Sequence, residues 1–288
     1  MPAEPRSTAG DRLYIATGAG PFDGVSAAGN TIQVWSVADG LFTHVKTINP
    51  EGAPGHPSPV FSLALAEPTP GGTAPAPTAP PTAADTASTA SAGPGPERHR
   101  LYAGSMDHTI TVWLDSGGLH GTLVGHTGAV SSLVTTRGGS ADIISPNFKL
   151  YSGSADATIR VWSAGGKHLQ TLSSHTGDIM SLAVSRDGTL LCSGSSDKTV
   201  KIWIWSTATG LMSIRHTLTG HRRTVYSLAL SPDASLLYTG SSDKTLRVWS
   251  AATGSQVERC RAGETYSLAL ASDGKRLYSG SDSDIKSW

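Results

Sequence analysis

Short stretches in which apolar and polar residues alternate follow one another along most of this 288-residue chain. Clear examples are SPVFSLALA (58–66), DIMSLAVS (178–185) and TVYSLALS (224–231). A two-residue period and enrichment in Val, Ile, Leu, Tyr and Thr are typical of β-strands, and Gly, Ser, Asp and Pro bound these stretches. No window has a convincing 3.6-residue apolar period. The pattern therefore predicts an all-β protein.

Three predicted strands recur in a fixed order. The alternating stretch is followed, across turns such as SRDG (185–188), by a segment such as KLYSGS (149–154) or LLCSGS (190–195). A segment in which Asp precedes Trp by six residues comes next: MDHTITVW (106–113), ADATIRVW (155–162), SDKTVKIW (196–203) and SDKTLRVW (242–249). GNTIQVW (29–35) and SDSDIKSW (281–288) are weaker copies. After the first step the Trp residues lie 39 to 49 positions apart, close to the period of roughly 40–45 residues of propeller repeats.

A histidine stands shortly before four of the alternating stretches: His56, His126, His175 and His221. With this histidine and the later Trp, the sequence resembles the WD40-repeat family of β-propellers over about residues 12–288. The resemblance implies four-stranded antiparallel blades in a ring, each burying its faces against its neighbours.

The resemblance also implies a structural set of hydrogen-bonded residues within a blade. Three complete sets match: His126, Ser152, Asp156 and Trp162; His175, Ser193, Asp197 and Trp203; His221, Thr239, Asp243 and Trp249. Two copies depart from the pattern. Ala103 stands where the 100–113 copy should have Ser, and Arg261 stands where the last copy should have His. We expect these two blades to be less firmly held.

In the family's order, a blade has an inner strand (the alternating stretch), a second strand such as KLYSGS, a third strand that ends at the Trp, and an outer strand. Six blades are visible, but the first has no visible inner strand and the last has no visible outer strand. The sequence thus predicts either six blades with an imperfect junction or part of a seven-bladed ring. We expect one propeller domain over residues 12–288 and a disordered N-terminus over residues 1–11. The Pro-, Ala- and Thr-rich insert 67–98 holds no large apolar residue, so it should be disordered.

Composition and motifs narrow the function. The formal net charge is zero, and the two cysteines, Cys192 and Cys260, lie in separate strand-like stretches. With no secretory signal and no apolar run of about 20 residues, we expect an intracellular protein, cytoplasmic or nuclear. His221-Arg222-Arg223 is a small basic spot, and it does not favour nucleic-acid binding. Metal-binding and hydrolase motifs are absent, and one His, Ser and Asp per repeat indicates a structural role. We therefore expect no enzyme activity, no metal and no cofactor.

The resemblance implies a non-catalytic scaffold or adaptor that binds proteins or peptides through the narrow top face of the propeller. The candidate partner-binding residues are Phe61, Met106, Asp178, Met180, Thr224, Tyr226, Glu264 and Tyr266. Each of them has the alternative role of packing against a neighbouring blade or lining the channel. An alternative function is the substrate-recognition part of a ubiquitin ligase complex. The sequence has no F-box-like helical segment, and no Trp is followed by Asp-x-Arg. Both observations count against that alternative.

Overall fold

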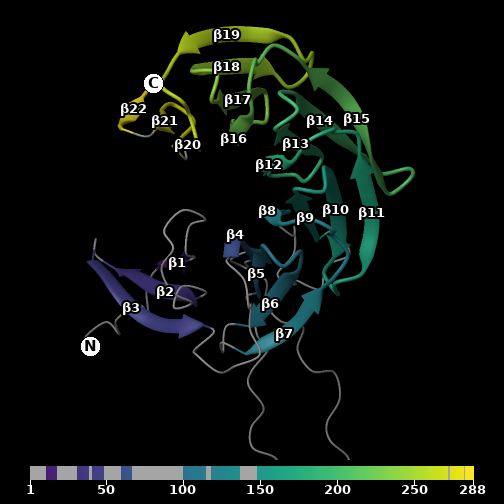
Figure 1. Ribbon diagram of the computed structural model, residues 1–288, viewed down its shortest axis with the longest axis vertical. Coiled ribbons are helices and arrows are strands. Elements are labelled where there is room, and N and C mark those ends of the chain that lie inside the picture. Colours follow the sequence, from purple (N-terminus) through teal and green to yellow (C-terminus); the bar gives the residue numbers. More distant parts are fainter. Residues whose placement is uncertain are drawn as a thin grey trace, which may run out of the picture.

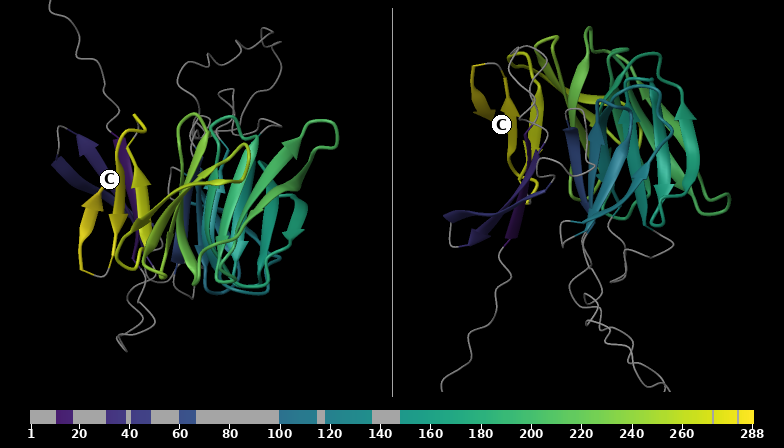
Figure 2. Two further views of the ribbon diagram at one scale, coloured as in Figure 1. Left: turned by 90° about the horizontal axis from the view of Figure 1, so that it is seen from above. Right: turned by 60° about the horizontal axis from the view of Figure 1, so that its bottom comes forward.

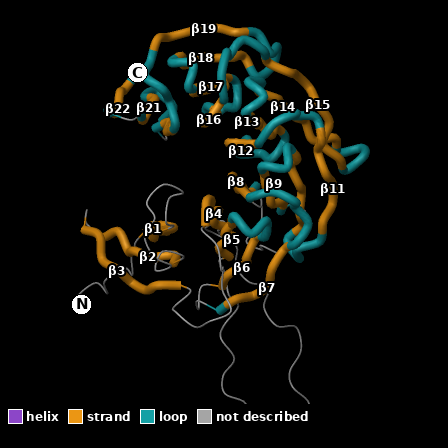
Figure 3. Tube along the Cα trace, in the orientation of Figure 1, coloured by secondary structure: helices purple, strands orange, loops and turns teal. Residues whose placement is uncertain are grey.

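The computed structural model describes residues 11–17, 31–38, 41–48, 60–66, 100–114, 118–136, 148–271, 273–281 and 283–288. The predictions for the N-terminus and for the insert 67–98 therefore lie outside the described residues, except that the first strand begins at Asp11, one residue before the predicted boundary. In the described part every regular element is a strand and none is a helix (Figure 3). The prediction of an all-β chain is confirmed.

The strands form six antiparallel sheets in chain order, each a simple meander. The first sheet holds β1 (Asp11–Thr17), β2 (Thr31–Ala38) and β3 (Leu41–Ile48). The second holds β4 (Val60–Ala66), β5 (Arg100–Ser105), β6 (Ile110–Leu114) and β7 (Leu119–Leu123). The third holds β8 (Val130–Thr135), β9 (Lys149–Ser154), β10 (Thr158–Ser163) and β11 (His168–Ser173).

The remaining three sheets continue the same order. The fourth holds β12 (Ile179–Val184), β13 (Leu190–Ser195), β14 (Val200–Ser206) and β15 (Leu211–Leu218). The fifth holds β16 (Val225–Leu230), β17 (Leu236–Ser241), β18 (Thr245–Ser250) and β19 (Gln256–Arg261). The sixth holds β20 (Ser267–Leu270), β21 (Leu277–Gly280) and β22 (Ile285–Ser287).

The sheets follow one another around an arc (Figure 1). Strands β4, β8, β12 and β16 lie nearest its centre, and β7, β11, β15 and β19 lie at its periphery. The two views in Figure 2 show the same succession of sheets from other sides. Within the described residues, second and third strands are present in six sheets and inner and outer strands in five, as the sequence predicts. This is the blade arrangement of a β-propeller.

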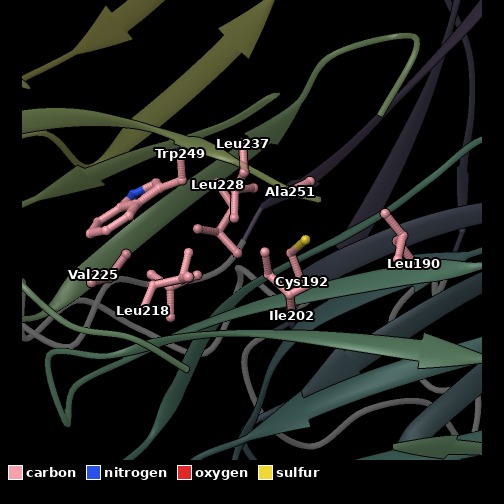
Figure 4. Packing of buried hydrophobic residues seen from close by; sticks show 10 residues of the cluster. Leu190, Cys192, Ile202, Leu218, Val225, Leu228, Leu237, Trp249 and Ala251 are labelled. Carbon is pink, nitrogen blue, oxygen red and sulfur yellow. The ribbon is translucent and has the colours of Figure 1, made fainter. Parts of the chain in front are cut away.

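The core lies between neighbouring sheets. In the cluster of Figure 4, Cys192, Ile202 and Leu218 of the fourth sheet pack with residues of the fifth. Their partners there include Leu228 and Trp249. A second cluster joins the third sheet to the fourth in the same manner. Burial of apolar surface at these seams stabilises both sheets at once, so the third, fourth and fifth sheets bury their faces against one another.

Glycines in the second strands allow neighbouring sheets to approach closely. A Cβ atom added to Gly194 would lie 2.9 Å from Val225 Cγ1, and one added to Gly104 would lie 2.7 Å from Val130 Cγ1. Gly153 and Gly240 have the same relation to the next inner strand. The recurring Gly of the second strand is therefore required by packing, because only Gly leaves room for the next sheet.

Serines of the inner strands connect the sheets further. Each serine oxygen accepts a hydrogen bond from the backbone N–H of a leucine in the next inner strand. The pairs are Ser62 with Leu133 (2.8 Å), Ser132 with Leu182 (3.0 Å), Ser181 with Leu228 (3.2 Å) and Ser227 with Leu268 (2.9 Å). The repeated Ser-Leu dipeptide of the alternating stretches thus links consecutive sheets.

The close approach at Gly194 predicts a stability effect. The change Gly194→Ala should lower the free energy of unfolding by about 1–3 kcal/mol, because the new methyl group overlaps Val225. Urea unfolding followed by circular dichroism measures this change. The matched control is Gly121→Ala in β7, where the added Cβ meets no atom within 4 Å. Equal unfolding midpoints for the two variants would contradict the packing role of Gly194.

Candidate functional site

We call one end of the sheets the top face. It is formed by the loops that enter the inner strands, such as 173–178 and 219–224, and by the turns between second and third strands, such as 195–199 and 241–245. Hydrogen bonds join loop to turn within a sheet: Ser196 N donates to Asp178 O (2.9 Å) and Ser242 N to Thr224 O (3.2 Å). The candidate binding residues lie on or next to these segments.

A chain of four side chains supports each complete loop and turn from below. In the fourth sheet Trp203 Nε1 lies 3.0 Å from Ser193 Oγ, which lies 2.8 Å from His175 Nε2. His175 Nδ1 in turn lies 2.7 Å from Asp197 Oδ2. The sets of His126 and His221 have the same contacts, at 2.7 to 3.0 Å. The hydrogen bonds that the family resemblance implied are thus present in all three sets.

The donors and acceptors define the protonation of the histidine. The indole N–H of Trp203 can only donate, so Ser193 Oγ accepts from it and directs its own hydrogen to His175. His175 Nε2 must then be unprotonated, and its Nδ1–H donates to Asp197. Each polar group in this set of four side chains has a partner only when the imidazole of His175 is neutral, with its proton on Nδ1.

The aspartate holds the turn and the loop together. Asp156 Oδ1 accepts from Thr158 N and Oγ1, at 2.9 and 2.6 Å, and its Oδ2 accepts from Thr127 N at 3.0 Å. Burial alone would raise the pKa of Asp156, but hydrogen bonds from Thr158, Thr127 and His126 outweigh it and lower the pKa to about 2. The pKa values of Asp197 and Asp243 are lowered to about 2 in the same way. The carboxylates are therefore ionised at neutral pH.

Burial has the opposite consequence for the histidines. It lowers the pKa of His126, His175 and His221 below the ordinary value of 6.5, although the facing carboxylates act to raise it. A neighbouring cation, such as Arg160 beside His126, adds to the lowering. The lowered pKa agrees with the neutral imidazole that the hydrogen bonds require.

The sets contain a Ser–His–Asp order, which is also the order of a hydrolytic triad. Ser152 and Ser193 are fully buried, and each accepts a hydrogen bond from a Trp. A substrate cannot reach these oxygens without displacing the Trp. The arrangement in these sets serves to hold the loops and turns in place.

In the two atypical sheets the Trp indole N–H groups also have hydrogen-bond partners. Trp113 Nε1 donates to Thr111 Oγ1 at 2.7 Å, which replaces the Ser missing at Ala103. Trp288 Nε1 donates to Ser279 Oγ at 2.9 Å, although one residue fewer separates them than in the other copies. Both indole N–H groups thus have partners, although Trp288 is 41% exposed and β22 is exposed throughout, and the looser holding of these two sheets stays a prediction.

The predicted binding residues of the inner strands share a backbone feature. In the second to fifth sheets the inner strand bulges near its start, and the residue left without a register partner is Phe61, Ser131, Met180 or Tyr226. The structure describes the backbone of Phe61 but not its side chain. A β-bulge re-aims side chains at a strand end, so these positions are suited to display residues at the top face.

The structure brings three of the eight candidates into contact. The rings of Tyr226 and Tyr266 lie 5.1 Å apart with a tilt of 56°. Tyr266 Oη donates to Glu264 Oε2 at 2.9 Å, and Lys244 Nζ lies 3.6 Å from Glu264 Oε1. Tyr266 is 40% exposed, so this cluster is open to solvent at the seam between the fifth and sixth sheets.

The other candidates lie apart from this cluster or contribute through the backbone. Met106 is 50% exposed on the turn of the second sheet, while Asp178 is exposed and Met180 half-buried in the fourth. Thr224 is half-buried and offers its carbonyl to Ser242. Sequence reasoning missed Lys244, although its place between the Asp and Thr of the turn is the signal that could have found it. This position has positive φ in four turns, at His108, Ala157, Lys198 and Lys244.

Comparison with known proteins assigns the family. The model of the WD domain, G-beta repeat (WD40), matches residues 117–163, 166–203, 212–250 and 259–288. The matches cover more than half of the chain, and the protein belongs to the WD40-repeat family. WD40 repeats generally mediate protein–protein interactions. A search of the curated proteins finds no match.

Two further findings concern the part of the chain that the structure describes. It contains no helix long and apolar enough to cross a membrane. It also contains no group of three or more His, Cys, Asp and Glu side chains placed to hold a metal ion.

The polar sets predict the cost of removing the central hydroxyl. Ser193→Ala leaves Trp203 Nε1 and His175 Nε2 buried without partners, so the free energy of unfolding should fall by about 2–4 kcal/mol. Chemical denaturation measures the loss. Ser213→Ala, an exposed change on β15, is the control and should change stability by less than about 0.5 kcal/mol. A neutral Ser193→Ala would contradict the role of the set.

The lowered pKa values predict acid sensitivity. In the unfolded chain the histidines bind protons near pH 6.5, whereas in the folded sets their pKa values are lower. The free energy of unfolding is therefore highest above that pH and falls as the pH decreases. A second loss follows below about pH 4, because unfolded Asp protonates near 3.8 and the folded carboxylates only near 2. The urea midpoint of the natural chain should decrease when the pH is lowered from 8 to 5. The H175Q/H221Q variant, compared with its own midpoint at pH 8, should show a smaller decrease. A steeper decrease in the variant would refute this linkage.

Proposed function

We propose that the protein is a non-catalytic scaffold or adaptor that binds partner proteins or peptides through its top face. The observation that supports this most strongly is the cluster of Tyr226, Tyr266, Glu264 and Lys244. Aromatic residues are enriched among the residues that dominate binding energy at interfaces. None of these four side chains belongs to the His–Ser–Asp–Trp sets that hold the loops.

The surroundings of the cluster suit a binding surface. Tyr226 and Tyr266 stand at the starts of adjacent inner strands, and backbone hydrogen bonds fix both loops to the turn 241–245. A rigid support reduces the entropy that is lost when a partner binds. The alternative role, substrate recognition in a ubiquitin ligase complex, stays a prediction from the sequence.

The proposal is tested by affinity purification with quantitative mass spectrometry. The full chain and the Y226A/Y266A variant are compared with L211A/I214A, a control that removes exposed apolar side chains from the outer strand β15. Binding partners should be retained by the natural chain and the control, and reduced at least about tenfold with Y226A/Y266A. Circular dichroism verifies that all three chains are folded. Equal retention by Y226A/Y266A would rule out this part of the top face.

A further inference from the structure

The loop that enters the fifth sheet differs in sequence from its two counterparts. After the buried histidine the other loops read Thr127-Gly128 and Thr176-Gly177, whereas this loop reads Arg222-Arg223. The backbone hydrogen bonds are the same in all three. Residues Thr127, Thr176 and Arg222 donate N–H to the turn aspartate, and the carbonyls of Gly128, Gly177 and Arg223 accept from the turn serine. The two arginines thus occupy loop positions that fold with Thr and Gly elsewhere.

Packing favours glycine at the second position in the other loops. A Cβ atom on Gly128 would lie 2.7 Å from Asp156 N, and one on Gly177 would lie 2.9 Å from Asp197 N. Arg223 is exposed at the equivalent position. Since the loop and turn are held by the same hydrogen bonds without an arginine, the fold does not explain why two arginines stand here.

The arginines lie beside the tyrosine cluster. Ser242 N donates to Thr224 O, and on the other side of the turn Ala262 N donates to Lys244 O and Thr265 N to Ser241 O. The three segments 222–226, 241–245 and 261–266 are therefore held together. We call the residues Arg222, Arg223, Tyr226, Lys244, Glu264 and Tyr266 the seam surface.

The accessible charge of the seam surface is positive. Arg222, Arg223 and Lys244 are exposed, and within the described residues neither arginine forms an ion pair. Glu264 is engaged by the Tyr266 hydroxyl and by Lys244. The Asp243 carboxylate is 5% exposed beneath the loop and accepts hydrogen bonds from Arg222 N, Thr245 and His221. Arg222 and Arg223 are therefore exposed on the same loop that leads to Tyr226, and backbone hydrogen bonds hold this loop to the turn that carries Lys244.

We propose that the seam surface binds an acidic peptide segment that carries an aromatic or aliphatic side chain. This inference rests on the proposed function and adds the chemistry of the partner. Carboxylates of the peptide bind Arg222 and Arg223, whose planar guanidinium groups suit bidentate contacts. The apolar side chain packs on Tyr226 and Tyr266. Charge complementarity selects acidic over basic segments and speeds association.

The aromatic geometry favours a peptide over nucleic acid. The rings of Tyr226 and Tyr266 contact each other at a tilt, and Tyr226 is half-buried. They do not form successive free faces on which bases could stack.

The test uses variants of the full chain. R222T/R223G restores the residues of the two other loops and should fold as well as the natural chain. R222E/R223E/K244E reverses three charges on the seam surface. K167E/R186E/R215E reverses three exposed charges elsewhere and is the control with the same change in net charge. Thermal unfolding compares the stability of all variants before binding is measured.

Random 12-residue peptides displayed on phage are selected against the natural chain, and the selected peptides are synthesised and labelled. Enrichment in Asp and Glu next to an apolar residue supports the proposal. The Kd of such a peptide should rise at least about tenfold with R222T/R223G and more with the triple seam variant, remain unchanged in the control, and rise with salt.

Other outcomes separate the two proposals. Peptides that are neutral or basic, yet lose binding with Y226A/Y266A, would overturn the acidic partner and keep the top-face function. Acidic peptides whose Kd is the same for R222T/R223G and the natural chain would also overturn the inference. Tighter binding of a single-stranded dT20 oligonucleotide than of any peptide, lost in R222T/R223G, would assign the surface to nucleic acid. Peptides insensitive to every top-face variant would contradict both proposals.

Discussion

Neighbouring sheets approach so closely at the inner strands that each sheet depends on the next for its stability. The contact is made where a glycine of one second strand meets the first buried residue of the next inner strand, as Gly194 meets Val225. Inner-strand serines then join the backbones across the same seam, as Ser181 does with Leu228. Packing and hydrogen bonding at this position fix how one sheet stands against the next, and hence where the top-face loops lie.

The His–Ser–Asp–Trp sets connect the packed core to the top-face loops and turns through hydrogen bonds. A buried indole, hydroxyl, imidazole and carboxylate would each be costly without partners, but in a directed chain all of them are satisfied. The aspartate at the end of the chain binds both the turn and the loop, as Asp243 does with Thr245 and Arg222. Because these contacts use side chains below the surface and backbone groups within the loop, the exposed side chains above them can vary without loss of support.

The sequence predicts the fold well because the repeat carries several independent signals. Alternation located the inner strands, and the spacing from Asp to Trp located the turns, so the order of strands in each described sheet could be foreseen. The chain of contacts from Trp203 to Asp197 followed from the family resemblance. Other features were beyond the sequence. The Thr111 hydroxyl that replaces the serine of the set depends on a local geometry that spacing does not encode. The burial of Phe148 against Tyr102 was also missed, because Phe148 stands just before the strand-like segment KLYSGS (149–154) and outside every repeated motif.

The candidate site was predicted only in part, for a related reason. Aligning the inner strands identified Tyr226 and Tyr266 as equivalent positions, but equivalence in a repeat does not show which neighbours meet. Their contact needs the fifth and sixth sheets at the observed separation, and the ion pair of Glu264 needs Lys244 from the intervening turn. The repeat nevertheless supplies an internal comparison that a single-copy fold would lack. Ser131 stands at the same position as Tyr226 and uses its hydroxyl to bond the carbonyl of Gly153, while Ala157 stands where Lys244 does. The third and fifth sheets have the same buried set of His, hydroxyl, Asp and Trp. Tyr226 and Lys244 of the fifth sheet are therefore not required for folding. Their concentration at one seam supports the proposal that this surface binds a partner.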